Sequence, residues 1–201
     1  MKKFSILFVL LLSIFLMSCK AELKLSLNQD GSMDIEYNGG SGDAFTKLMV
    51  AATGKDTIFN ADALSDQLMW NGFSNVDVKI NGTSEIKLKM KDKNCSSYFF
   101  TSGLVAQNNG SLTINFTNEA VKKFYDTADE QTKMILDLLI APVFNDQSIG
   151  EEQYLIMLGS LYGKDAAAEI KESVLNVEIK SYNGNKVSFS YKLPEVLCGN
   201  L

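Results

Sequence analysis

The chain has 201 residues, 46% hydrophobic and 21% charged, with a formal net charge of −5. Its length and apolar content suit one domain of ordinary size with a proper core, and its acidity argues against a nucleic-acid partner, which needs a basic patch. All 19 basic residues are lysine and histidine is absent, which excludes a Ser-His or Cys-His nucleophile pair, an imidazole metal site and an arginine clamp for phosphate. We therefore expect a protein that is not an enzyme and holds no metal or other cofactor.

The first segment has the pattern of an export signal. Lys2 and Lys3 precede an apolar run of about 14 residues, which suits a signal-peptide core and is shorter than the roughly 18 residues that span a bilayer. The run closes in Leu-Met-Ser-Cys at residues 16–19.

This ending resembles the lipobox of bacterial lipoproteins, in which the cysteine receives a diacylglyceryl group and becomes the mature N-terminus. The resemblance covers residues 1–19 only. It implies a signal peptide over residues 1–18 and a mature chain, 19–201, held in a membrane of the cell envelope through Cys19, on the periplasmic side or at the outer membrane. Two acyl chains are enough for stable anchoring. The alternatives are a cleaved signal peptide with an incidental cysteine, and an uncleaved anchor.

The mature chain starts close to its first strand. Only Lys20 and Ala21 separate Cys19 from a pattern of alternating apolar and polar residues, so no flexible tether holds the domain away from the membrane. Without Lys2 and Lys3 the formal charge moves to about −7.

The first half of the mature chain reads as hairpins and short helices. Period-two alternation on both sides of a glycine turn predicts a β-hairpin over residues 22–37. A helix should follow over residues 43–54. Asn60 is a suitable N-cap for a second helix, which Gly72 should end. A second hairpin is expected over residues 73–91.

The second half begins with a fifth strand at residues 112–116 and a long helix from Asn118 to Pro142. Ser148 and Glu151 have the spacing of a capping box for the next helix, which should stop at Gly163.

Two elements complete the chain. Asp165 should cap a short alanine-rich helix. Strands at residues 177–179 and 187–193 should form a third hairpin. Because each strand has one apolar and one polar face, the sequence predicts one α+β domain: an antiparallel sheet of about seven strands with helices packed on one face.

The most apolar segments after the signal are residues 134–144 and 154–162. A helix that is apolar nearly all round is usually buried on several sides. These segments could therefore form a thick core, a dimer face, a membrane-facing surface or the wall of a lipid pocket. The residues that would line such a ligand or partner surface are Leu136, Leu139, Ile140, Leu155 and Leu158.

Cys95 and Cys198 remain after Cys19 is acylated. In an oxidising compartment they are a candidate disulfide, which in the chain-entropy model could contribute up to roughly 4–5 kcal/mol; two free thiols are the alternative.

Two polar patterns have both a structural and a functional interpretation. Lysines alternate over residues 87–93, either as a solvated strand face or as a patch for anionic lipid headgroups. Oxygen-bearing residues alternate over residues 28–34, superficially like a calcium loop, although Gly39 stands where such a loop needs a bidentate glutamate.

The function we expect is that of a membrane-anchored envelope lipoprotein with a structural or protein-interaction role. The alternative is a module that binds a lipid or another apolar ligand between the helices around residues 134–162. A hydrolase using Glu151 or Glu152 is disfavoured, because no paired-carboxylate pattern stands out.

Overall fold

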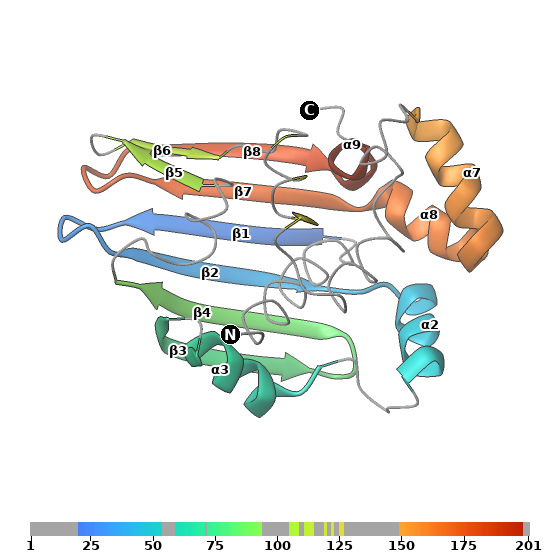
Figure 1. Cartoon of the computed structure of the whole chain (residues 1–201), viewed down its shortest axis with the longest axis horizontal. Coiled ribbons are helices and arrows are strands. Elements are labelled where there is room, and N and C mark those ends of the chain that lie inside the picture. The colour runs from blue at the N-terminus through green and yellow to red at the C-terminus, as the bar shows by residue number, and fades with distance from the viewer. Residues whose placement is uncertain are drawn as a thin grey trace.

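The computed structural model describes residues 20–53, 59–70, 72–93, 105–108, 111–114, 119, 122, 125–126 and 149–198, and has an α+β fold (Figure 1). A six-stranded sheet runs in the order β3-β4-β2-β1-β7-β8. Its strands are β1 (Lys20–Leu27), β2 (Met33–Gly40), β3 (Phe73–Asn81), β4 (Glu85–Asp92), β7 (Val174–Lys180) and β8 (Lys186–Lys192).

Two further strands and five helices accompany this sheet in the described part of the chain. The two strands pair only with each other, as an antiparallel hairpin. These elements are β5 (Val105–Asn108), β6 (Ser111–Ile114), α2 (Asp43–Thr53), α3 (Ala61–Trp70), α7 (Glu151–Tyr162), α8 (Lys164–Glu172) and α9 (Leu193–Leu197).

The sheet is mixed, which corrects the expected antiparallel sheet of about seven strands. β1 pairs antiparallel with β2 but parallel with β7, with Leu23 opposite Val177. The other neighbours are antiparallel. Alternation along a strand determines which face each residue occupies, but it does not identify a neighbour about 150 residues further along the chain.

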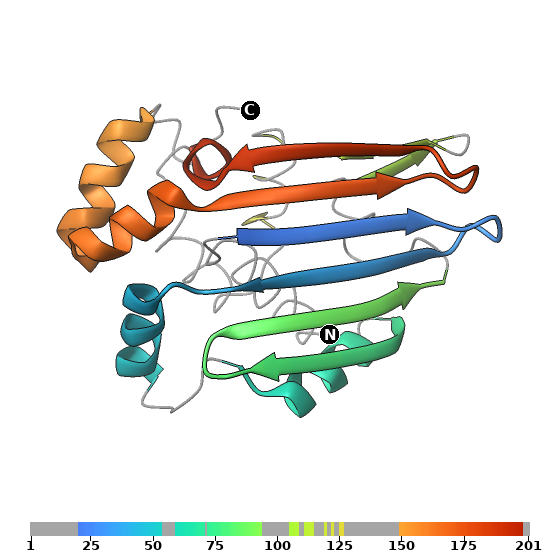
Figure 2. The same cartoon turned by 180° about the vertical axis from the view of Figure 1, so that it is seen from behind.

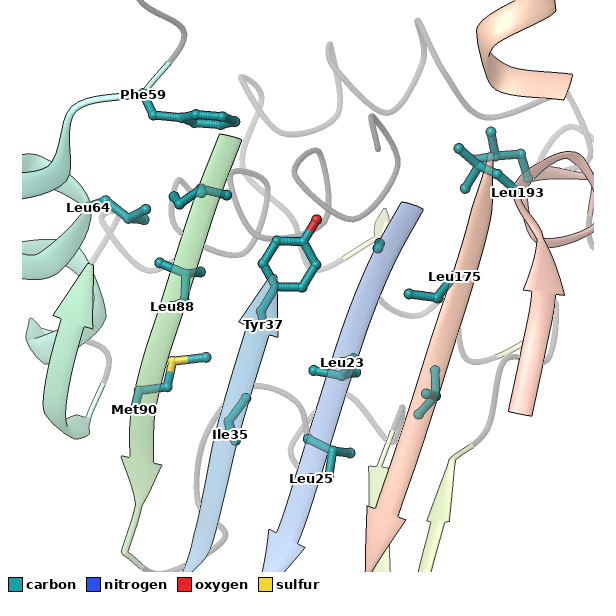
Figure 3. Close-up of a cluster of buried hydrophobic side chains, with 14 of the residues drawn as sticks. Leu23, Leu25, Ile35, Tyr37, Phe59, Leu64, Leu88, Met90, Leu175 and Leu193 are labelled. Atoms are coloured by element: carbon teal, nitrogen blue, oxygen red, sulfur yellow. The ribbon is translucent and has the colours of Figure 1, made fainter. Parts of the chain in front are cut away.

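One face of the sheet forms the core. Along β1, β2 and β4 buried positions alternate with more exposed ones, as the period-two pattern predicts. Figure 3 shows side chains from four neighbouring strands gathered on this face. Each of the following is at most 7% exposed: Leu23, Leu25, Ile35, Tyr37, Leu88, Met90, Leu175 and Val177.

Helix α3 covers the core beside β3 and β4. The Asn60 side-chain oxygen accepts a hydrogen bond from the Ala63 backbone N–H at 2.9 Å, which confirms the predicted N-cap. Leu64 and Leu68 on the inner side of α3 are almost fully buried, and Figure 3 shows Leu64 directed toward the sheet. The apolar spacing of this helix therefore serves the core.

The remaining long helices lie at one end of the sheet. Figures 1 and 2 both show α2, α7 and α8 at this end, while the turns of the β1–β2 and β7–β8 hairpins lie at the opposite end. The expectation that the helices pack on one face therefore holds for α3, whereas these three helices lie beyond the strand ends.

Two predicted helix caps and one strand boundary are wrong. The N-cap of α7 is Gly150 and not Ser148. Helix α8 begins one residue before Asp165, after Gly163, whose φ of 93° favours glycine. Leu193 is the buried first residue of α9 and does not continue β8, because Pro194 cannot donate a backbone hydrogen bond to a strand.

Candidate functional site

The predicted attachment residue immediately precedes the sheet. Cys19 lies outside the described residues, and Lys20 is the first residue of β1. Lys20 lies opposite Val174, two residues after the end of α8. The chain therefore enters the sheet at the end where α2, α7 and α8 lie (Figure 2).

The predicted apolar surface separates into two parts. Leu158 is fully buried in the core, whereas Leu155 on the same helix is only partly buried and packs against that core. Leu136, Leu139 and Ile140 lie outside the described residues. Core packing thus explains the apolar residues on the inner side of α7.

The outer side of α7 borders a pocket of about 560 Å³ against α8. Small residues allow the two helices to lie close together. A Cβ atom at Gly159 would already lie 3.6 Å from the Ala167 Cβ. Leu155 and Ile156 form part of the apolar wall, and Ile156 is 62% exposed. Lys164 and Lys171 also line this pocket.

A second pocket, of about 580 Å³, separates α2 from α8 and contains a carboxylate that no sequence pattern indicated. The two oxygens of Glu169 accept hydrogen bonds from the backbone N–H groups of Ala44 (2.8 Å) and Phe45 (3.1 Å). These are two of the donors that the first turn of a helix leaves without a partner. Glu169 thus caps α2 from about 125 residues away, and no local motif could have revealed it.

Cys198 carries a free thiol that is only 3% exposed. Burial, and then the negative charge of Glu151, raise the pKa of this thiol to about 11. Cys95 lies outside the described residues, so its pairing with Cys198 in the oxidised protein stays a prediction.

In the reduced protein, Cys198 should react with iodoacetamide far more slowly than the same residue in urea-unfolded chains. At pH 8 a pKa of about 11 leaves roughly a hundredfold less thiolate than the ordinary value of 9.0. Because the pKa of this thiol is higher in the folded protein than its ordinary value of 9.0, its contribution to stability is fully present below pH 9. That contribution is lost as the pH rises through about 11. Peptide mass mapping of the alkylation time course measures the rate, and equal rates in folded and unfolded protein would contradict this environment.

The alternating lysines lie on the exposed face of the sheet, among carboxylates of neighbouring strands. Lys89 Nζ lies 2.8 Å from Glu36 Oε1, and Lys91 Nζ lies 3.9 Å from Asp34 Oδ1. The hydrogen bond to Glu36, and then its charge, raise the pKa of Lys89. Because these lysines meet opposite charges across the strands, the solvated-face interpretation is favoured over a patch for anionic headgroups.

The oxygen-rich β1–β2 turn is held by its own hydrogen bonds. Asp30 accepts hydrogen bonds from the backbone N–H and the hydroxyl of Ser32, and these bonds lower the pKa of Asp30. The Asn28 amide donates to Ser32 and to Asp34. Within the described residues no three His, Cys, Asp or Glu side chains are grouped so that they could hold a metal ion.

The hydropathy of the helices and the comparisons with known proteins do not identify a function. None of the helices in the described ranges is both long and apolar enough to cross a membrane. The chain matches no protein-family model, no curated protein and no solved structure. What the protein does must therefore be inferred from the lipobox-like pattern at residues 16–19 and from the surfaces described above.

Proposed function

We propose that this chain is an envelope lipoprotein, attached to its membrane through a diacylglyceryl group on Cys19, with a structural or protein-interaction role and no catalytic activity. The observation that carries the proposal is the lipobox-like ending at residues 16–19, followed at once by a folded strand. Signal cleavage before Cys19 would remove none of the described residues.

The start of β1 supports close contact with the membrane. Ala21 is only 1% exposed, and Leu23 two residues later is already a core residue. One peptide bond joins Cys19 to the sheet, so the acylated residue can move little relative to the domain. An exposed tether of many residues would instead favour a domain that acts at a distance.

Exposed apolar side chains favour an interaction role. Helix α7 carries Ile156 (62% exposed) and Leu161 (64%), and β8 carries Val187 (53%) and Phe189 (42%). Val187 and Phe189 lie on one face of β8, and contiguous exposed apolar side chains of this kind are typical of surfaces that contact a protein or a lipid.

Replacing Cys19 by alanine should abolish acylation. The mature domain should then move from the membrane fraction to the soluble fraction, because both acyl chains are lost. Labelling with a radioactive fatty acid, followed by fractionation of the envelope, measures both effects. Cys198→Ala is the matched control, since it removes a thiol that the motif does not include and should leave labelling and location unchanged.

Full membrane retention of a cleaved Cys19→Ala protein would contradict the proposal. Persistence of the fatty-acid label in that variant would contradict it as well, because the lipid would then be attached to another residue.

The second candidate function is binding of a lipid or another apolar ligand, and the pocket between α7 and α8 favours it. Native mass spectrometry of protein purified from its envelope should then detect a bound lipid in addition to the covalent anchor. Ile156→Asp should remove that lipid without unfolding the protein, because Ile156 is largely exposed.

A further inference from the structure

Among the described strands, β8 forms one edge of the six-stranded sheet. In the sheet formed by the described residues, β8 is terminal and pairs only with β7, in an unbroken register from Lys186–Lys180 to Lys192–Val174. Its apolar residues Val187 and Phe189 lie opposite Ile179 and Val177, on the core side, yet they remain 53% and 42% exposed. The core face therefore continues onto β8, where these two side chains remain about half exposed.

The opposite edge of the sheet is protected, which makes β8 unusual. β3 has a bulge between Ser74 and Asp77, and Asn75 within it has a φ of 52°. Asp77 and Lys79 then place an exposed ion pair of 3.0 Å on that strand. Bulges and charges are the devices that keep edge strands from pairing with other chains. Between its terminal lysines, β8 has no charge, no proline and no bulge.

The sequence of β8 is nearly symmetric about its central residue. It reads Lys-Val-Ser-Phe-Ser-Tyr-Lys, with Phe189 at the centre. An antiparallel partner strand of the same sequence, centred on Phe189, would bring Val187 opposite Tyr191, and Ser188 opposite Ser190. Apolar side chains would meet on one face and serines on the other, which are favourable cross-strand pairs.

We infer that β8 is a self-association edge, on which a second copy of this chain pairs its own β8 antiparallel, with Phe189 on the two-fold axis. Such an interface is isologous, because the same strand serves both copies. The two sheets would join into one continuous sheet. The rings of Phe189 and Tyr191 stack within one copy, with centroids 6.2 Å apart and planes 17° from parallel.

The lysine charges at the ends of this pairing are partly offset. Lys186 would lie opposite Lys192 of the second copy, which alone would be repulsive. Lys186 Nζ, however, lies 3.0 Å from Glu178 Oε1 on the neighbouring β7, so Glu178 offsets one of the two lysine charges at each end.

The pairing also determines how an anchored dimer lies. Paired strands run in opposite directions, so the two Lys20 residues would be at opposite ends of the joined sheet. Both copies of Cys19 can reach one membrane only when the strands run along its surface. The inference itself does not depend on the anchor, so a Cys19→Ala chain should associate in the same way.

Cysteine cross-linking of the full chain in its native envelope tests the register. In antiparallel strands, directly opposed Cα atoms lie about 4.5–5.5 Å apart, within the range that a disulfide needs. Phe189→Cys should therefore cross-link to itself on mild oxidation. Val187→Cys should not, because its own counterpart would lie about 14 Å away along the strand. Mixed Val187→Cys and Tyr191→Cys chains should cross-link to each other.

Trp70→Cys controls for random collision, since Trp70 is 72% exposed on α3, away from β8. The unsubstituted chain controls for its native thiols. Cross-linking of Phe189→Cys no faster than that of Trp70→Cys would overturn the inference. Cross-linking of Val187→Cys chains to each other as fast as that of Phe189→Cys would overturn it as well. In detergent, the unsubstituted acylated chain should have the mass of a dimer and Phe189→Lys that of a monomer. If the unsubstituted acylated chain has the mass of a monomer in detergent, at protein concentrations like those at which Phe189→Cys cross-links in membranes, the inference would also be overturned.

Discussion

Replacing Leu158 by alanine is expected to lower the free energy of unfolding by about 2–5 kcal/mol. The Leu158 side chain is 0% exposed and belongs to the core cluster together with Tyr154. Its truncation removes buried methyl groups and leaves a cavity that the close-packed core around it fills only in part. Urea unfolding followed by circular dichroism measures the loss.

Ile156→Ala is the matched control on the same helix. Ile156 lies two residues away but is 62% exposed, so its truncation should change the free energy of unfolding by less than about 1 kcal/mol. Equal losses for the two variants would contradict the assignment of one α7 face to the core. A small loss for Leu158→Ala with altered lipid binding would favour the ligand-binding alternative.

Replacing Glu169 by glutamine is expected to cost about 1.5–3 kcal/mol, because hydrogen bonds to a charged acceptor are stronger than neutral ones. The variant keeps the size of the side chain. It loses the charge and one acceptor, so one N–H of the first turn of α2 remains without a partner. Hydrogen exchange should show faster exchange at Ala44 and Phe45, ahead of any change in the sheet.

Two further variants make this test specific. Glu172→Gln removes a carboxylate from an exposed position of the same helix and should leave exchange in α2 unchanged. Gly42→Ala should have an effect similar to that of Glu169→Gln, because a Cβ at this position would lie 2.4 Å from the Glu169 carboxylate carbon. Unchanged exchange at Ala44 in both Glu169→Gln and Gly42→Ala would contradict the proposed cap.

Local features of this fold could be predicted from the sequence. The three hairpins have turns within a few residues of alternating patterns, and Asn60 lies directly before its helix. In each case the signal and the structure that it specifies lie within about ten residues of each other. Short-range sterics and hydrogen bonding therefore decide the outcome.

Features that depend on distant residues could not be predicted. The parallel pairing of β1 with β7 and the contact of Glu169 with α2 join segments from different parts of the chain. The near-symmetric sequence of β8 is visible in the sequence, but its place at the edge of the sheet is known only from the strand order. A local motif can also mislead. Ser148 and Glu151 have the spacing of a capping box, but the N-cap of α7 is Gly150.

Intact-mass and N-terminal peptide analysis of the protein from its native envelope tests the central claim most directly. The account predicts that the mature chain begins at Cys19 and that this residue carries a diacylglyceryl group on its sulfur. A mature chain that begins elsewhere, or a Cys19 that carries no lipid in membrane-derived protein, would contradict it.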